Sequence, residues 1–263
     1  MALTKITSLQ NPKIKQLLCL QQKSSERRRQ NLFVVEGQRE LTRCLKAGHK
    51  AETIFICPEI NNADYSTYGT NLKIHEVTLE IYNKIAYRGT TEGVVAIVTP
   101  HNTNLSDLCL KEKPLLVVLE RVEKPGNLGA ILRSADASGV DAVIICDPLT
   151  DLYNPNLIRN STGAIFSVPC LTTTSQECIE WLKCNHIQIV TAQLQDSVEY
   201  YETDFTKGTA IIMGTEADGL SPLWREIADC HIRIPMLGMV DSLNVSVSAA
   251  ILMYEALRQR KNK

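Results

Sequence analysis

The 263-residue sequence lacks the cysteine and histidine spacings that bind metal ions. Its nine cysteines include no Cys-x-x-Cys pair, and its five histidines are not spaced like zinc ligands, so we expect no metal site. An odd number of cysteines without a disulfide framework is typical of reduced, mostly buried thiols. We therefore expect a cytoplasmic protein.

Other absences exclude whole classes of protein. No apolar run approaches the roughly 20 residues that cross a membrane, and the first residues contain no apolar segment typical of a secretory signal. No strand is followed by Gly-x-Gly-x-x-Gly with a fitting acidic residue about 20 positions later, which disfavours the usual dinucleotide-binding fold. The sequence also shows no internal repeat and no low-complexity tract.

The net charge of -1 conceals a strongly basic N-terminal segment. Residues 1–50 contain 11 Lys and Arg against 3 Asp and Glu, so they carry +8 and the remainder carries -9. Local positive charge attracts nucleic-acid phosphates, and Arg27, Arg28 and Arg29 are the candidate contacts. A solvated basic helical surface explains the same charge, and composition alone does not choose between the two interpretations.

The first hundred residues alternate between helix and strand signals. Residues 1–31 predict basic helical structure, with Pro12 in the first turn of a helix. Strands are expected at 32–35, 53–56, 73–77 and 94–98, and helices at 38–47 and 79–85. A polar, turn-rich segment over residues 100–107 is the expected linker. These signals predict a small α/β domain over residues 1–104.

Residues 105–263 repeat the alternation with longer apolar strands. The strands are expected at 115–119, 142–146, 187–191, 209–213 and 231–234, with helices between them and after the last. Because these strands are apolar on both faces, they are typical of a parallel sheet that helices cover on both sides. The sequence therefore predicts a second α/β domain over residues 105–263.

Three strand-to-turn junctions in this second half carry polar residues. After the first strand, residues 124–135 open a helix that contains Asn127 and Arg133. The strand 209–213 runs into the turn Gly214-x-Glu216-x-x-Gly219, whose first glycine permits a close approach of backbone. Residues 234–251 run from a strand end through a loop with glycine and proline into a long helix.

The helix after the third junction has an expected cap and an expected apolar face. Ser242 is the predicted N-cap, because its hydroxyl can accept from an unpaired N–H group of the first turn. Asn244 and Ser248 lie one turn apart on another face, so this helix start presents donors and short polar side chains to a polar ligand. The apolar face predicted at helical spacing comprises Leu243, Val247, Ala250, Ile251, Tyr254 and Leu257.

In order and residue type, the three junctions resemble the three motifs of the SpoU (TrmH-like) RNA ribose 2′-O-methyltransferases of the SPOUT superfamily. The resemblance spans about residues 115 to 260 and implies S-adenosylmethionine as cofactor and RNA as substrate. It also implies a trefoil knot formed by the segment 235–260, and a homodimer whose interface adjoins the cofactor site. Residues 33–41 are similar to the N-terminal substrate-binding domain of many SpoU enzymes, an α/β sandwich, which favours ribosomal over transfer RNA.

The resemblance carries roles over to matching positions of this sequence. The implied catalytic residues are Arg133, Asn127, Glu216 and Asn244. The implied cofactor-binding residues are Gly214, Glu216, Gly219, Ile234, Met236, Ser242, Leu243 and Asn244. Lys124 is a candidate RNA contact, and it stands where the family usually has an acidic or amide residue. Ser248 replaces a small apolar residue.

The chemistry of methyl transfer suits these assignments. A ribose 2′-hydroxyl must lose its proton, whereas a sulfonium methyl is already electrophilic, so the enzyme mainly aligns the two and assists proton loss, without a metal. A guanidinium with a pKa above about 12 is a poor base at pH 7, so we expect Arg133 to position groups and stabilise charge. Alternatively, Asn127 has only a structural role in the turn, where asparagine is common, and Glu216 is a structural carboxylate.

Three alternative functions remain open at this stage. The chain can be a transfer-RNA 2′-O-methyltransferase, a SPOUT enzyme that methylates a base nitrogen, or an inactive RNA-binding member of the family. The presence of Arg133, Glu216 and Asn244 argues against the inactive member.

Overall fold

The described residues of the computed structural model fall into two compact units. They are residues 4–61, 63, 65, 72–87, 92–215 and 218–261. The first unit consists of Met1–His101 and Tyr153–Ser167, and the second consists of Asn102–Leu152 and Val168–Lys263. Residues 153–167 thus pack with the first unit, although they follow the predicted linker in the sequence.

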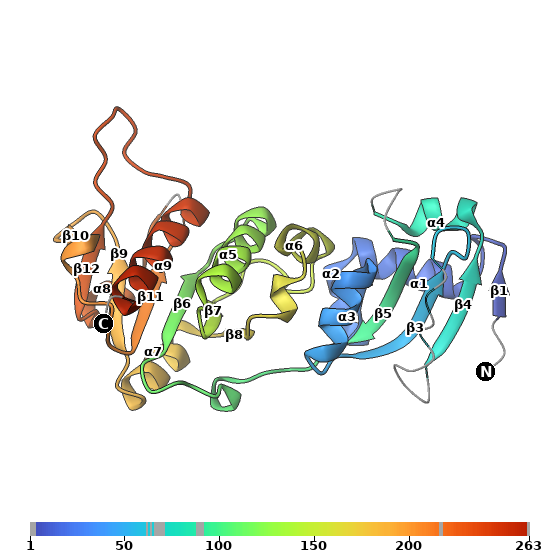
Figure 1. Cartoon of the computed structure of the whole chain (residues 1–263), viewed down its shortest axis with the longest axis horizontal. Coiled ribbons are helices and arrows are strands. Elements are labelled where there is room, and N and C mark those ends of the chain that lie inside the picture. Colours follow the sequence, from blue (N-terminus) through green and yellow to red (C-terminus); the bar gives the residue numbers. More distant parts are fainter. Residues whose placement is uncertain are drawn as a thin grey trace. The chain divides into compact units, whose positions relative to one another are not determined.

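A five-stranded mixed sheet forms the centre of the first unit (Figure 1). The strand order is β1-β4-β3-β5-β2, in which β4 is parallel to β1 and β3, whereas β5 is antiparallel to β3 and β2. The strands are β1 Thr4–Ile6, β2 Phe33–Glu36, β3 Lys50–Ile56, β4 Lys73–Val77 and β5 Val94–Thr99. The four predicted strands are confirmed. The helix prediction is wrong at β1, where pairing with β4 and burial of Ile6 override local propensity.

Helices pack on both faces of this sheet, and the side chains of β2 alternate between the two. The helices are α1 Pro12–Gln22, α2 Ser24–Gln30, α3 Gln38–Lys46, α4 Leu79–Ile85 and α6 Pro155–Ser161. Val34 belongs to the apolar cluster that contains residues of α1 and α4. The neighbouring Phe33 points the other way, because successive residues of a strand face opposite sides.

An aromatic cluster on that second face holds residues 153–167 against the sheet. The ring of Phe33 stacks on Tyr153 at a centroid distance of 4.3 Å, and His49 meets Phe166 edge-on at 5.4 Å. Burial lowers the pKa of His49 to about 4, so its ring is neutral at pH 7. Its Nδ1 then accepts the backbone N–H of His101 at 2.9 Å.

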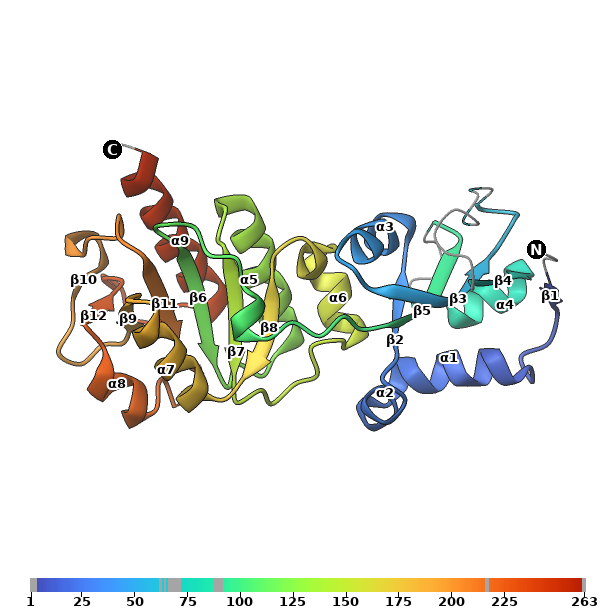
Figure 2. The ribbon, with the colours of Figure 1, turned by 90° about the horizontal axis from the view of Figure 1, so that it is seen from below.

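Seven parallel strands form the sheet of the second unit, in the order β10-β12-β9-β11-β6-β7-β8 (Figures 1 and 2). They are β6 Leu115–Glu120, β7 Ala142–Cys146, β8 Cys170–Thr173, β9 Gln188–Ala192, β10 Val198–Glu199, β11 Thr209–Met213 and β12 Cys230–Arg233. Every residue of β6, β7 and β11 is buried. The predicted parallel α/β sheet is confirmed, and the short strands β8 and β10 are additions at its two edges.

Four helices cover the two faces of this parallel sheet. Helices α5 Pro125–Ser138 and α9 Val245–Lys261 pack together on one face, and α7 Ser175–Cys184 and α8 Pro222–Ile227 lie on the other (Figures 1 and 2). The apolar cluster beneath α7 and α8 includes the fully buried Trp224. This two-sided covering explains why the strands read as continuous apolar runs.

Helix α9 begins later than predicted and buries a different face. Its N-cap is Asn244 rather than Ser242, because the Asn244 Oδ1 accepts the N–H of Ser246 at 2.9 Å. The predicted apolar face is wrong, since Val247 and Tyr254 are 47% and 49% exposed. The buried residues are Val245, Ala249, Leu252, Met253 and Ala256. The helix is apolar on two faces, so spacing alone could not identify the one that meets the sheet.

Arg27 caps the C-terminal end of α1. It is only 6% exposed, and its Nη1 donates to the carbonyl oxygens of Leu20 at 2.6 Å and Gln21 at 3.2 Å. These carbonyls lie in the last turn of α1, where no further helical N–H is available to them. The expectation that Arg27 is a surface contact for nucleic acid is therefore corrected, because its guanidinium joins α1 to α2.

The substitution Arg27→Ala should lower the free energy of unfolding by about 2 kcal/mol, because it leaves buried carbonyl groups without donors. The matched control is Arg28→Ala, which removes an exposed neighbour and should change the free energy by less than about 0.5 kcal/mol. Urea unfolding followed by circular dichroism measures both. Tryptophan fluorescence is unsuitable, because Trp181 and Trp224 both lie in the second unit. Equal stability of the two variants would contradict the capping role.

Candidate functional site

Three loops of the second unit line one cavity of about 370 Å³. They follow β9, β11 and β12, and they meet because the carboxyl ends of parallel strands lie at the same edge of a sheet. The lining comprises residues 192–195, residues 213–215 and 218–220 with Arg225, and residues 232–248 in part. Ligands of α/β proteins bind at this edge, so the position of the cavity is itself informative.

The turn after β11 is held by close backbone contact. Thr215 and Gly219 exchange two backbone hydrogen bonds, of 3.2 and 3.1 Å, and the Thr215 Oγ1 accepts the N–H of Asp218 at 2.9 Å. A Cβ atom added to Gly214 would lie 2.1 Å from the carbonyl oxygen of Gly219. Gly214 therefore allows the chain to fold back on itself, and this contact shapes the wall of the cavity.

The first and third junctions meet through two asparagines. The Asn244 Nδ2 donates to the Asn127 Oδ1 at 3.2 Å, which links the start of α9 to the first turn of α5. The Asn244 Oδ1 meanwhile accepts from the backbone N–H and the hydroxyl of Ser246. Asn244 thus uses both ends of its amide, one to cap α9 and one to fix Asn127.

A second cavity of about 550 Å³ adjoins the first. It is lined by the loop after β6 and by the other side of the turn after β11, and Arg121, Lys124 and Asn127 face it. At its wall the buried carboxylate of Glu120 accepts the N–H of Ser221 at 2.7 Å. Residues common to both cavities are Thr215, Asp218, Gly219, Leu220, Arg225 and Val245.

Most of the predicted cofactor-binding residues line the first cavity. They are Gly214, Gly219, Ile234, Met236, Ser242 and Leu243. Asn244 does not line it, and instead contacts Asn127. Glu216 lies outside the described residues. Arg133 is exposed on α5 and lines neither of the two cavities.

The other candidate nucleic-acid contacts, Arg28, Arg29 and Lys124, lie in different environments. Arg28 is exposed, whereas Arg29 forms an ion pair with Glu26 at 2.6 Å. Hydrogen bonds from Arg29 and then Gln30 lower the pKa of Glu26 to about 2, so the carboxylate stays charged and offsets Arg29 at pH 7. Lys124 lines the second cavity.

Sequence reasoning missed several residues of the site. The loop 193–195 was not singled out, although it follows a predicted strand whose neighbours carry the motifs. Arg225 lines both cavities, and its Nε is buried without a hydrogen-bond partner among the described residues. Arg233 also lines the first cavity and donates to the carbonyl oxygen of Ser197. The end of a parallel strand could have indicated residues 193–195 and Arg233, whereas Arg225 lies in α8 and had no such signal.

The first cavity fits S-adenosylmethionine in size and in chemistry. Its volume falls within the range of about 300–1,000 Å³ that is typical of small-molecule sites. Ile234, Met236 and Leu243 offer apolar contact for an adenine, while Thr215 and Ser242 offer hydroxyl groups. Across the described ranges, no group of three or more His, Cys, Asp and Glu residues could hold a metal ion. In the same part of the chain, no helix is both long and apolar enough to span a bilayer.

Comparison with known proteins agrees with this geometry. Residues 114–254 match the SpoU rRNA Methylase family, and residues 11–96 match the MRM3-like substrate binding domain. A Staphylococcus epidermidis protein assigned to the TrmH family of tRNA/rRNA methyltransferases is 32% identical over 239 residues, which cover 87% of this chain and 96% of that protein. The 23S rRNA (uridine(2479)-2′-O)-methyltransferase of Streptomyces viridochromogenes is 36% identical over 173 residues, or 64% of this chain and 60% of that enzyme.

Solved structures show the same likeness over almost the whole chain. The crystal structure of an AdoMet-bound rRNA methyltransferase from Sinorhizobium meliloti superposes with a TM-score of 0.88 at 29% identity. The superposition covers 97% of this chain and 98% of the Sinorhizobium meliloti chain. The family match covers more than half of the sequence and includes all three motif junctions. The chain belongs to the SpoU rRNA Methylase family.

Proposed function

We propose that the chain transfers a methyl group from S-adenosylmethionine to a ribose 2′-hydroxyl of RNA, and that the substrate is ribosomal RNA. The observation that carries this proposal is the pair of adjoining cavities at one sheet edge. One is built for the cofactor and the other is lined by Arg121, Lys124 and Asn127. The rRNA description of the family and the 23S rRNA 2′-O-methyltransferase among the relatives favour ribosomal over transfer RNA.

Each part of the site then has a task in the transfer. The bound cofactor supplies a methyl group on a sulfonium centre. The backbone around Gly214, Ile234, Met236 and Leu243 holds its adenine and ribose, while Asn244 braces Asn127 beside the second cavity. Arg133 fixes the nearby phosphate and stabilises charge as the hydroxyl loses its proton. The proposed catalytic set is Arg133, Asn127, Glu216 and Asn244.

The proposal assigns RNA binding to residues 1–104 and catalysis to residues 105–263, the latter with a trefoil knot in the segment 235–260. The match of residues 11–96 to a substrate-binding domain supports the first assignment. Arg28, Arg29 and Lys124 are the proposed phosphate contacts. All nine cysteines are free thiols, which is in keeping with a cytoplasmic protein.

The proposed assembly is a homodimer through the C-terminal domain. An apolar stripe on α9 that includes Val247 and Tyr254 stays exposed in the single chain. In the loop before α9, Leu237 and Met239 are fully exposed, and Val240 is 63% exposed. Exposed apolar side chains gathered on neighbouring segments of the chain are in keeping with an interface between protein molecules.

The substitution Gly214→Ala should weaken S-adenosylmethionine binding by about tenfold or more, which corresponds to about 1.4 kcal/mol. The added Cβ overlaps the Gly219 backbone, so the turn that lines the cavity has to move. The matched control is Gly238→Ala in the loop after β12, where an added Cβ meets no atom within 4 Å. Calorimetric titration of both variants measures the effect. Unchanged affinity in the Gly214 variant would contradict the assignment of the cavity, and no binding by the unaltered folded protein would contradict the proposed function.

The substitution Arg133→Ala should lower methyl transfer about a hundredfold or more, the scale seen when a positioned charge-stabilising group is lost. Cofactor affinity should stay within a few-fold, because Arg133 lies outside the cofactor cavity. Arg133→Lys should restore activity only in part, since a point charge and a planar fork bind phosphate differently. Nucleoside mass spectrometry of nuclease-digested RNA measures the transfer and locates the methyl on ribose or base. Near-normal turnover of Arg133→Ala would reject the proposed role.

Replacing Arg28 and Arg29 together by alanine should weaken RNA binding and make its salt dependence shallower. The slope of log affinity against log salt should fall by up to about 0.7 per lost phosphate contact on a single strand. The matched control is Arg258→Ala, because Arg258 forms an i,i+3 ion pair with Glu255 like the pair of Arg29 and Glu26. Filter binding at several salt concentrations supplies the slopes. If the double variant and the control share the slope of the unaltered protein, the basic segment is only a solvated surface.

A further inference from the structure

Arg225 of α8 lies on the wall that the two cavities of the second unit share. Among the arginines that line these cavities, it is the one that belongs to both linings. It stands outside the three motifs, and the proposed function gives it no task. The side chain is half-buried, so a charged group is placed where the first cavity adjoins the cavity assigned to RNA.

The described contacts give the Arg225 side chain no structural partner. Its Nε is buried and has no hydrogen-bond partner within the described ranges of the chain. Its Nη2 lies 3.5 Å from the position that a Cβ atom would take at Gly219, so it stands beside backbone that carries no side chain. Buried polar groups are normally hydrogen-bonded, and an exception calls for an explanation. A charged side chain that the fold places at a cavity wall without using it points to a ligand.

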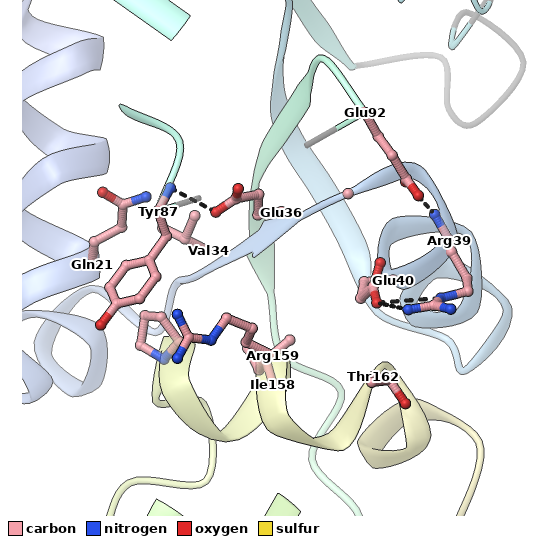
Figure 3. Close-up of a pocket in the computed structure, with 12 residues that line it drawn as sticks. Gln21, Val34, Glu36, Arg39, Glu40, Tyr87, Glu92, Ile158, Arg159 and Thr162 are labelled. Atoms are coloured by element: carbon pink, nitrogen blue, oxygen red, sulfur yellow. Dashed lines mark hydrogen bonds and ion pairs between the residues drawn. The ribbon is translucent and has the colours of Figure 1, made fainter. Parts of the chain in front are cut away.

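The charged side chains around the cavity of the first unit are, in contrast, bound within the protein (Figure 3). Arg39 forms an ion pair with Glu40 at 2.8 Å. The Glu36 carboxylate accepts the backbone N–H of Tyr87, also at 2.8 Å. Arg159, whose Nε also lacks a hydrogen-bond partner among the described residues, lies with its guanidinium over the Tyr87 ring, 4.9 Å from the centroid. These charges are already in contact with other groups, so this cavity points to no charged ligand.

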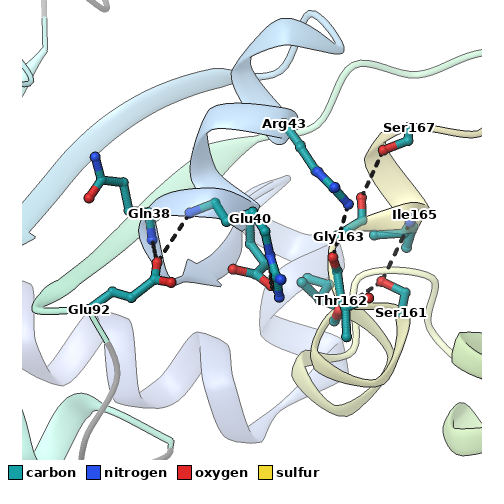
Figure 4. A network of polar contacts seen from close by, with 11 residues as sticks. Gln38, Glu40, Arg43, Glu92, Ser161, Thr162, Gly163, Ile165 and Ser167 are labelled. Atoms are coloured by element: carbon teal, nitrogen blue, oxygen red, sulfur yellow. Dashed lines mark hydrogen bonds and ion pairs between the residues drawn. The ribbon is translucent and has the colours of Figure 1, made fainter. Parts of the chain in front are cut away.

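A network of polar contacts in the same unit shows the usual task of such groups (Figure 4). The Glu92 carboxylate accepts the N–H groups of Gln38 and Arg39 at the start of α3. Arg43 of α3 donates to the carbonyl oxygen of Thr162 at 3.1 Å. Each of these charged side chains fixes a segment of backbone, whereas the described contacts give Arg225 no segment to fix.

The charges that line the first cavity suit the amino-acid end of S-adenosylmethionine. They are Asp218, Arg225, Arg233 and Asp241. Arg233 donates to the carbonyl oxygen of Ser197, which leaves Arg225 as the cation of this lining without a described bond. The cofactor carries a carboxylate and an ammonium group on the same carbon atom. A guanidinium binds a carboxylate through two parallel hydrogen bonds, and the two aspartates are acceptors for the ammonium group.

We propose that Arg225 binds the α-carboxylate of S-adenosylmethionine and thereby holds the sulfonium methyl group where the two cavities adjoin. A short chain of carbon atoms joins the carboxylate to the sulfur, so fixing the one limits where the other can lie. The methyl group has to meet a hydroxyl group in the second cavity, and Arg225 belongs to both linings. An RNA phosphate is the other anion of this site, but the second cavity has its own cations, Arg121 and Lys124. The inference deepens the proposed function and rests on it.

The test compares the affinity of the full chain for S-adenosylmethionine and for its decarboxylated form, which lacks only the carboxylate, by calorimetry without RNA. The unaltered protein should bind S-adenosylmethionine about tenfold more tightly, the scale of hydrogen bonds between charged groups. Arg225→Ala should remove this preference and leave the affinity for the decarboxylated form unchanged, which also shows that the variant is folded. Arg225→Gln, which keeps most of the stem, should give the same result, and Arg225→Lys should restore the preference only in part.

The matched control is Arg233→Ala, which removes the other arginine of the same cavity. Because that guanidinium holds the Ser197 carbonyl group, its loss should affect both ligands alike and preserve the ratio of their affinities. Equal affinities in the unaltered protein, a preference that survives Arg225→Gln, or a preference that Arg233→Ala also removes would overturn the inference.

RNA binding separates the two anions. Weaker RNA binding by Arg225→Ala with an unchanged ratio of the two cofactor affinities would assign Arg225 to a phosphate and overturn the inference. In each of these cases, cofactor binding and ribose methylation by the unaltered protein would leave the proposed function standing. An unaltered, folded protein that binds neither form of the cofactor would overturn both.

Discussion

The common direction of the strands in the second unit is the constraint on which its site depends. Strands β6, β9, β11 and β12 are parallel, and β9 lies between β12 and β11 while β11 lies between β9 and β6. Their carboxyl ends therefore open at one edge, and the loops that follow must gather there although they are far apart in the sequence. Reversing any one of these strands would send its loop to the opposite edge and leave the cavity without a wall.

Acidic side chains accept hydrogen bonds from N–H and hydroxyl groups that have no partner in a neighbouring strand. Glu120 accepts the N–H of Ser221 at 2.7 Å, and Asp229 accepts the N–H of Ile189, also at 2.7 Å. Asp147 accepts the hydroxyl of Ser175 at 2.6 Å and so anchors the start of α7. Backbone N–H groups at strand ends must find acceptors when they are buried, and a carboxylate is a strong one. Of these contacts, the one between Glu120 and Ser221 holds the loop after β11, which lines the second cavity, through a side chain outside the three motifs.

Much of this fold could be predicted from the sequence, because apolar runs and turn residues mark buried strands directly. The strands β6, β7, β9, β11 and β12 follow from such runs, and the second and third junctions locate most of the first cavity. What could not be predicted depends on contacts between distant segments. β1 exists because β4 pairs with it, and Arg27 is buried because the end of α1 needs its donors. Helix α9 is apolar on two faces, and only its packing against the sheet and α5 determines which face is buried.

Arg133 is a proposed catalytic residue whose role the single chain does not explain. A group that assists proton transfer must come within about 3 Å of the hydroxyl in the reacting complex. Arg133 is exposed on α5, outside the lining of both cavities. The helix that packs against α5 is α9, and α9 carries the exposed apolar stripe with Val247 and Tyr254. A second copy seated on that stripe would cover the region beside α5. The role proposed for Arg133 therefore depends on the proposed homodimer. Pairing of two chains would place the surface of the partner beside this exposed arginine.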